Sequence, residues 1–256
     1  MPRVTRASRL GFSYRLAVVL LRRPMLLLTH HQWSGAEHLD VDGGVIVAPN
    51  HISWFDPLVT AHFLFDNDRP PRFLAKDAVF RVPVLGRLIR NAGQIPVMRD
   101  TVDAARSVAA GVEALERGEC VVVYPEGTIT RDPELWPMSG KTGAARLALM
   151  TGAPLLPMAQ WGAQHVMAPY SWRLRLLPPK TVRVVLAPPV GLDDLRSLPI
   201  DADTLRIATE RLMEAITAAL EEVRGGKPPL RRMNFHGSRE QRGPKSNEAR
   251  NRRSGT

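Results

Sequence analysis

The chain has 256 residues, 44% hydrophobic and 23% charged, a balance typical of a globular protein with one sizeable core. Its single cysteine, Cys120, excludes an intramolecular disulfide, and the run CVVVY predicts that it is a buried strand residue. The net charge of +10 is concentrated at the ends: residues 1–24 carry six Arg and no acid, and residues 225–256 carry nine Lys or Arg and two Glu. Basic ends suit an anionic surface, either bilayer or nucleic acid.

The N-terminal stretch is the most lipophilic part of the chain. Its apolar runs, LAVVLL and MLLL, are interrupted by Arg15, Arg22, Arg23 and Pro24. Neither run approaches the roughly 20 apolar residues needed to span a bilayer. The pattern predicts a basic and apolar helical membrane anchor over residues 1–32, with a helix packed on the protein's own core as the alternative.

Beyond this stretch, short β-branched runs alternate with helical patterns. The predicted strands are Val45–Ala48, Arg72–Ala75, Gln94–Met98, Cys120–Tyr124, Pro154–Gln160 and Thr181–Ala187. Helices are predicted over residues 102–115, after the N-cap signal Asp100–Thr101, and over residues 142–150 and 202–223. The alternation predicts an α/β fold, a single domain over residues 33–224 with a largely parallel central sheet flanked by helices. Residues 225–256 contain few apolar side chains and are predicted to form a disordered basic tail.

The motif NHISWFD, residues 50–56, follows the first of these strands. A histidine side chain exchanges protons near neutral pH, and a carboxylate on its far ring nitrogen fixes the tautomer and stabilises the imidazolium. Residues five apart point in different directions in a regular helix, so His51 and Asp56 can meet only if the backbone turns. Pro57 favours such a turn because it biases Asp56 away from helical angles.

This H-x4-D pattern is short enough to arise by chance, in which case Asp56 would only cap a helix. No other His or Cys stands at metal-ligand spacing around it, so no metal site is predicted. The chain also lacks a G-x-S-x-G elbow for a serine nucleophile. The pattern gains weight from the motifs that follow it.

Two further motifs follow in order, GQIPVMR (Gly93–Arg99) and YPEGT (Tyr124–Thr128), with a looser block, LLPMAQWG, over residues 155–162. Together with NHISWFD they resemble the glycerolipid acyltransferase family, typified by 1-acyl-sn-glycerol-3-phosphate acyltransferases. The resemblance covers roughly residues 45–190. It implies an O-acyltransferase of phospholipid biosynthesis that moves a fatty acyl group from acyl-CoA or acyl carrier protein to a lysophosphatidate- or glycerol-3-phosphate-type hydroxyl.

The resemblance implies that His51 is the general base and that Asp56 holds its imidazole, with neither metal nor organic cofactor. The expected substrate-binding residues are Asn50, Gly93, Arg99, Glu126, Gly127, Thr128, Arg131 and Lys141. For Arg99 the chemistry agrees, since a guanidinium can hold a phosphate in bidentate fashion. For Glu126 two roles stay open: it accepts hydrogen bonds from glycerol hydroxyls, or it satisfies backbone amides of its own loop.

The chain departs from the family pattern at Ile129, where an arginine usually follows the threonine of the third motif. The phosphate of the acceptor must then be held elsewhere. We expect Arg99 and at least one of Arg131 and Lys141 to hold it. The alternative is that Arg131 pairs with the nearby acids Asp132 or Glu134.

The expected partners are the membrane surface, with anionic lipid, the lipid acceptor and the acyl donor, at the cytoplasmic face of the cell membrane as a peripheral or monotopic protein. Nucleic acid is not expected, because no binding module accompanies the basic tail. The alternative functions are a lipid-binding protein without turnover and an acyl hydrolase in which the same base activates water. Trp54 is expected near the acyl path. The stretch YSWRLRLL, residues 170–177, is either a second membrane contact or an exposed strand.

Overall fold

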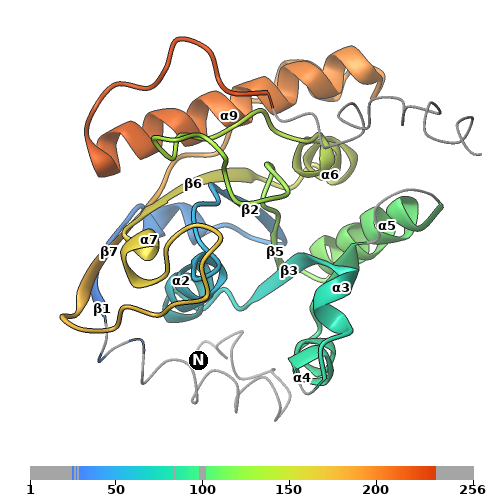
Figure 1. Cartoon of the computed structure of the whole chain (residues 1–256). Coiled ribbons are helices and arrows are strands. Elements are labelled where there is room, and N and C mark those ends of the chain that lie inside the picture. Colours follow the sequence, from blue (N-terminus) through green and yellow to red (C-terminus); the bar gives the residue numbers. More distant parts are fainter. Residues whose placement is uncertain (1–24, 26, 28, 84, 98–101, 235–256) are drawn as a thin grey trace, which may run out of the picture.

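The computed structural model describes residues 25–234 except 26, 28, 84 and 98–101 (Figure 1). Within them, a seven-stranded sheet has the order β1-β7-β6-β2-β5-β3-β4. The strands are β1 (Thr29–Ser34), β2 (Val45–Pro49), β3 (Pro71–Lys76), β4 (Ile95–Val97), β5 (Cys120–Val122), β6 (Leu155–Trp161) and β7 (Lys180–Leu186). Neighbouring strands are parallel except β6 and β7, so β1 and β7 run against the other five. The prediction of an α/β domain with a largely parallel sheet is confirmed.

All six predicted strands are present, with ends that differ by at most two residues. In β2, Val45 and Val47 enter one hydrophobic core and Ile46 and Ala48 enter the other, because successive side chains of a strand point to opposite faces. A strand buried on both faces therefore shows a continuous apolar run, which is the signal that predicts it. Cys120 is buried in β5, as expected.

The predicted helical anchor over residues 1–32 requires a correction at its end. Thr29–Ser34 form the edge strand β1, which pairs in parallel with β7. Its sequence, THHQWS, has no β-branched run, so pairing with β7 rather than local propensity makes it a strand. Residues 1–24, 26 and 28 lie outside the described part of the chain. Among the described residues, no helix is long and apolar enough to cross a bilayer.

Helices flank the sheet on both faces (Figure 1). They are α2 (Asp56–Asp66), α3 (Asp77–Phe80), α4 (Leu85–Asn91), α5 (Val102–Glu116), α6 (Gly143–Thr151), α7 (Ala163–Val166), α8 (Asp193–Arg196), α9 (Ala202–Arg224) and a 3-10 turn, η2 (Ala36–Leu39). The predictions for α5, α6 and α9 hold to within one residue at each end, whereas the N-cap signal Asp100–Thr101 lies outside the described residues. At the start of α9 the Asp201 side chain accepts the Thr204 N–H, which satisfies one of the helix's unpaired amides. Residues 225–234 form no helix or strand, and residues 235–256 of the predicted tail are not described.

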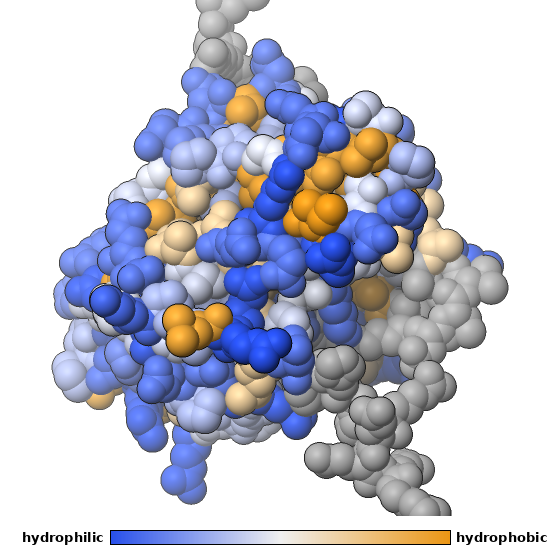
Figure 2. Space-filling model, turned by 90° about the horizontal axis from the view of Figure 1, so that it is seen from above, coloured by the Kyte–Doolittle hydropathy of each residue, from blue (hydrophilic) through white to orange (hydrophobic). Residues whose placement is uncertain are grey.

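Two large cores hold the layers together, and a smaller cluster around Trp136 packs against the end of α9. One large core lies on one face of the sheet and contains side chains of α5, α6 and α9. The other lies on the opposite face of the same strands and contains side chains of α2 and α7. The face that carries α9 is mostly hydrophilic, with apolar side chains in small separate patches (Figure 2). An amphipathic helix packed on a sheet gives this pattern, since its apolar stripe faces the core.

The parallel pairing decides where the sequence motifs meet. β2 pairs with β5 on one side and with β6 on the other, so the carboxyl ends of all three strands lie at one edge of the sheet. Asn50–Asp56 follow β2 and Tyr124–Thr128 follow β5. Loops at this edge are where open α/β sheets bind ligands.

Candidate active site

His51 and Asp56 lie in direct contact. The Nδ1 atom of His51 is 2.9 Å from Oδ2 of Asp56, and both side chains are buried, with Asp56 fully so. Because Nδ1 faces the carboxylate, Nε2 is the ring nitrogen that remains for exchanging a proton with a substrate. The pair therefore has the geometry of a base and the carboxylate that orients it.

The backbone turn that allows this contact lies before Asp56. Oδ2 of Asp56 also accepts the N–H groups of Ile52 at 2.5 Å and Ser53 at 2.7 Å. The carboxylate thus organises the loop that carries His51. Asp56 itself is the first residue of α2, and Pro57 stands in its first turn, where a missing N–H costs no helical hydrogen bond. The predicted turn is confirmed, but Asp56 belongs to the helix rather than to an extended segment before it.

Burial raises the pKa of Asp56, whereas the hydrogen bond and charge of His51 and the amides of Ser53 and Ile52 oppose that rise. Its position in the first turn of α2 also favours the carboxylate, because the helix N-terminus carries partial positive charge. Oδ1 is buried and has no hydrogen-bond partner among the residues that the structure describes. The His51 ring and the N–H groups of Ile52 and Ser53 therefore all donate to the same oxygen, Oδ2.

The Glu126 side chain contacts the loop that carries His51. Its Oε1 accepts the His51 N–H at 2.9 Å and its Oε2 accepts the Met138 N–H at 3.0 Å. The side chain is buried, and this burial raises its pKa to about 8. Of the two roles that the sequence leaves open for Glu126, these contacts correspond to the second, a carboxylate that satisfies backbone amides.

The turn after β5 is closed by a hydrogen bond from the Gly127 N–H to the Tyr124 carbonyl oxygen at 3.0 Å. Gly127 has φ of 67°, which a side chain would disfavour, so the glycine is required by the turn. Thr128 is half-buried and follows directly. The backbone N–H of Lys141 donates to the Pro125 carbonyl at 2.8 Å, which places the exposed Lys141 beside this turn.

Asn50 is buried against the neighbouring strand rather than directed into the loop. Its side chain exchanges two hydrogen bonds with the backbone of Gln160, and the Gln160 side chain donates to the Asn50 carbonyl at 2.9 Å. These contacts tie the end of β2 to β6. Gln160 lies 110 positions away in the sequence, and its place in the looser block LLPMAQWG is the one signal that could have singled it out.

Aromatic rings surround the His51 imidazole. The Tyr124 ring lies 4.4 Å from it, centroid to centroid, and the Trp54 ring lies edge-on at 6.2 Å. Burial raises the pKa of Tyr124, and the charge of Asp56 adds to the effect, so its hydroxyl stays neutral and shares a hydrogen bond with Thr60. Trp54 also stacks on Trp172, with centroids 5.6 Å apart. Trp54 thus lies beside the His51 ring, and its position relative to an acyl chain stays a prediction. The stacking of Trp172 on Trp54 is not apparent from the sequence.

The remaining predicted site residues belong to other loops of the chain. Gly93, with φ of 68°, is exposed between α4 and β4. Arg99 lies outside the described residues. Ile129 is fully buried, and the exposed Arg131 belongs to the loop that leads back to Met138. The Oδ1 atom of Asp132 accepts the N–H groups of Glu134 and Trp136.

One known protein family matches half of this chain. The family model described as Acyltransferase matches residues 30–161, which run from β1 to the end of β6 and include both His51 and Glu126. The chain belongs to the acyltransferase family.

Several proteins are similar to this chain over half of its length or more. The 1-acyl-sn-glycerol-3-phosphate acyltransferase of Bacillus subtilis is 27% identical over 70% of this chain and 83% of that protein. The enzyme of the same name from Borreliella burgdorferi is 28% identical over 52% of this chain and 51% of that protein. The protein Rv0502 of Mycobacterium tuberculosis, whose function is uncharacterised, is 32% identical over 68% of this chain and 52% of that protein. The chain therefore spans about half the length of several of its relatives.

A solved structure shares the fold of this acyltransferase-family chain. The 1-acyl-sn-glycerophosphate acyltransferase PlsC of Thermotoga maritima superposes with a TM-score of 0.62 and 24% identity, over 84% of this chain and 81% of that chain. This likeness supports the architecture and carries no detail of the site.

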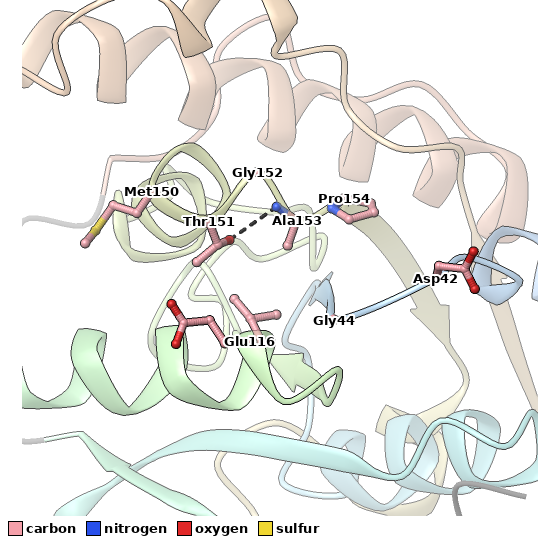
Figure 3. Close-up of a pocket in the computed structure, with 9 residues that line it drawn as sticks. Asp42, Gly44, Glu116, Met150, Thr151, Gly152, Ala153 and Pro154 are labelled. Carbon is pink, nitrogen blue, oxygen red and sulfur yellow. Dashed lines mark hydrogen bonds between the residues drawn. The ribbon is translucent and has the colours of Figure 1, made fainter.

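A pocket of about 360 Å³ lies at the opposite edge of the sheet (Figure 3). Gly44 and Pro154, which directly precede β2 and β6, line it together with Asp42, Glu116 and the turn at residues 150–153. It contains none of the predicted site residues. In the described part of the chain, no three His, Cys, Asp or Glu side chains are grouped so that they could hold a metal ion.

Proposed function

We propose that this protein is an O-acyltransferase that transfers a fatty acyl group from a thioester donor to a hydroxyl of a lysophosphatidate- or glycerol-3-phosphate-type acceptor. Family membership and the names of its relatives support acyl transfer in glycerolipid synthesis. The single observation that carries the proposal is the buried contact between His51 Nδ1 and Asp56 Oδ2 at 2.9 Å.

In the proposed reaction, His51 Nε2 takes the proton of the acceptor hydroxyl as the oxygen attacks the thioester carbonyl. A carbon–oxygen bond forms and the carbon–sulfur bond then breaks. The imidazolium returns its proton to the departing thiolate, so the enzyme ends in its starting state. Asp56 keeps the proton on Nδ1 and stabilises the imidazolium between the two transfers.

The residues around this pair have supporting roles in the proposal. Asn50 and Glu126 hold the ends of β2 and of the His51 loop in place through backbone hydrogen bonds. The phosphate of the acceptor would be held by Arg99 together with Arg131 or Lys141, since Ile129 offers no donor. Gly93, Gly127 and Thr128 would shape the loops in which the acceptor lies.

The donor in this proposal is acyl-CoA or acyl carrier protein, and neither a metal nor an organic cofactor takes part. The protein would work at the cytoplasmic face of the cell membrane as a peripheral or monotopic protein, where its lipid acceptor resides. Anionic lipid would attract the two basic ends of the chain.

Mass spectrometry of the products tests this proposal. The full chain is incubated with palmitoyl-CoA or oleoyl-CoA and with lysophosphatidate, glycerol-3-phosphate or monoacylglycerol, and His51→Ala serves as the control. We expect one acylated phosphorylated acceptor for each free CoA released. Free fatty acid as the product would identify the hydrolase alternative, and binding of the acceptor without any product would identify a lipid-binding protein.

A further inference from the structure

The segment between α7 and β7, residues 168–179, forms a loop fastened to the candidate active site. The Ser53 hydroxyl donates to the Met167 carbonyl at 2.6 Å, just before the loop. The Tyr170 hydroxyl donates to the Ile129 carbonyl at 2.5 Å. Arg175 returns to Val166 through a backbone hydrogen bond of 2.7 Å. The loop is thus held to the loops that carry His51 and Glu126.

The 168–179 loop presents large apolar side chains to solvent. Trp172 is 78% exposed, Leu174 is 53% exposed and Leu177 is 77% exposed. Folded proteins rarely leave several large apolar side chains uncovered within a few residues unless the surface has a partner. Because the loop is held by hydrogen bonds, presenting these side chains costs little further ordering.

The charge of the loop identifies the kind of partner. Between the apolar positions stand Arg173 and Arg175, both exposed, and residues 168–179 include no acid. Trp, Leu and Arg in alternation match an interface between hydrocarbon and anionic headgroups, where indole rings and leucines enter and guanidinium groups stay at the phosphates. A purely apolar protein partner would not need the two arginines.

The loop also lies next to the catalytic pair. Trp172 stacks on Trp54 with ring planes 6° from parallel, and Trp54 meets the His51 ring edge-on. A bilayer that contacted Trp172 would therefore be separated from the His51 imidazole by two stacked indole rings, those of Trp172 and Trp54. A lipid hydroxyl at the headgroup level could then reach the base without leaving the membrane.

We propose that the 168–179 loop docks on an anionic bilayer and that Trp172, Leu174 and Leu177 enter its interface. This rests on the proposed function in one respect: docking brings the lipid acceptor to His51. The loop acts as a membrane contact separate from the N-terminal segment and from the basic tail.

A site-specific fluorophore tests the contact. Cys120 is buried, so a cysteine introduced by Leu177→Cys in the full chain can be labelled selectively with an environment-sensitive dye. Leu198→Cys is the matched control, an exposed leucine between α8 and α9. On adding phosphatidylglycerol–phosphatidylcholine vesicles, we expect the dye at 177 to shift to the blue and to be quenched by nitroxide-labelled lipid, and the dye at 198 to keep its spectrum.

Charge reversal provides the second measurement. Arg173→Glu with Arg175→Glu should weaken vesicle partition roughly tenfold or more at low salt, and the difference should shrink as salt is raised. Arg206→Glu on α9 is the control and should bind as the wild type does. Partition of the double variant equal to the wild type at low salt would overturn the assignment to an anionic surface.

Three other outcomes would overturn the proposal. They are a dye at 177 that ignores vesicles, a dye shielded from a soluble quencher before vesicles are added, and a response that follows protein concentration alone, which would indicate self-association. Docking is measured without acyl donor, so it is separable from catalysis. A chain that docks at 177 and transfers no acyl group contradicts the proposed function, whereas transfer to a short-chain soluble acceptor without docking contradicts the loop contact.

Discussion

The Glu126 side chain binds the backbone of His51 and not its imidazole: Oε1 of Glu126 accepts the His51 N–H at 2.9 Å. The second oxygen of the carboxylate accepts the Met138 N–H, so one buried side chain links the loop after β2 to the loop after β5. A change at Glu126 should therefore affect stability as well as turnover.

The buried Glu126 carboxyl should make the stability of the fold depend on pH. Its pKa is raised from 4.5 to about 8 by burial, so the folded state binds this proton more tightly than the unfolded chain does. The resulting stabilisation is fully present below pH 4.5 and is lost as the pH rises towards 8. Glutamine does not titrate. The advantage of the wild type over Glu126→Gln in unfolding free energy should therefore decrease as the pH rises from 4.5 to about 8, as measured by denaturant titration.

Glu126→Gln should also be less stable than the wild type at pH 5, by about 1–3 kcal/mol, because its NH₂ group faces a backbone N–H. Glu221→Gln, at an exposed position near the end of α9, is the control for removing a carboxylate. A stability difference for Glu126→Gln that stays constant from pH 5 to pH 8 would show that Glu126 does not titrate in this range.

His51→Ala should abolish most turnover and leave the fold intact. The backbone of residue 51 keeps its hydrogen bonds, because its N–H donates to Glu126 and its carbonyl accepts the Thr130 N–H at 2.7 Å whatever the side chain. Loss of a general base costs on the order of a hundredfold to ten-thousandfold. The checks are kcat/KM and Tm measured together, and a folded variant with near wild-type kcat/KM would exclude His51 as the base.

Asp56→Asn separates orientation from charge. Because all three donors converge on Oδ2, the asparagine oxygen can accept them while its NH₂ group takes the place of the unpartnered Oδ1. We expect a stability loss of about 1–3 kcal/mol from the buried unpaired NH₂. The kcat should fall by on the order of a hundredfold to ten-thousandfold, since no charge stabilises the imidazolium.

A second His–Asp contact on α2 serves as the control for this substitution. Asp66 lies 3.3 Å from His62 at the other end of the helix. Asp66→Asn should therefore leave kcat unchanged. Equal losses of kcat in Asp56→Asn and Asp66→Asn would point to damage to α2 rather than to the chemistry.

The contrast between β2 and β1 shows how far the fold could be predicted from the sequence. β2 is apolar on both faces, and its run of β-branched residues identifies it directly. β1, with the sequence THHQWS, depends on its partner β7, which lies about 150 positions later, and no local pattern encodes that pairing. Local propensity predicts strands that contain a β-branched run and fails for the edge strand β1, which is held by a distant partner.

The candidate site divides in the same way. The contact of His51 with Asp56 follows from spacing and a turn signal, because both residues belong to one short segment. The hydrogen bonds of Glu126, the ties between Asn50 and Gln160 and the stacking of Trp172 join residues far apart in the chain. Parallel pairing of β2 with β5 and β6 brings them together, and residue spacing alone does not record that register.

Removal of residues 1–24 should weaken membrane binding without unfolding the domain. Met25 is buried in the core beside α2, and β1 begins at Thr29, so a deletion that ends at residue 24 leaves the sheet complete. If LAVVLL contributes an interfacial anchor, its burial is hydrophobic, and the loss of liposome binding should persist at high salt. Removal of residues 235–256 is the comparison and should weaken only salt-sensitive attraction. Liposome co-sedimentation at low and high salt measures both, and unchanged binding of the N-terminal deletion would refute the anchor.

The phosphate of the acceptor must be bound without the arginine that Ile129 replaces. Ile129 is fully buried and has no donor to offer. Lys141 is held beside the Glu126–Gly127 turn by its hydrogen bond to Pro125, and Arg131 lies in the loop that follows the same turn. Both are therefore candidates for binding the phosphate, and Arg99, which lies outside the described residues, is the third member of this proposed phosphate clamp.

Neutralising one member of the clamp should raise the KM of a phosphorylated acceptor and leave the KM of the acyl donor nearly unchanged. The loss in kcat/KM should be about 2–4 kcal/mol, or roughly thirtyfold to nearly a thousandfold, because a charge-assisted contact to the phosphate is removed. Arg99→Ala, Arg131→Ala and Lys141→Ala are compared on lysophosphatidate and on monoacylglycerol, which lacks the phosphate. Arg117→Ala, at the opposite edge of the sheet before β5, should behave as the wild type. An unaltered preference for the phosphorylated acceptor in all three variants would exclude the clamp and point to an acceptor of another class.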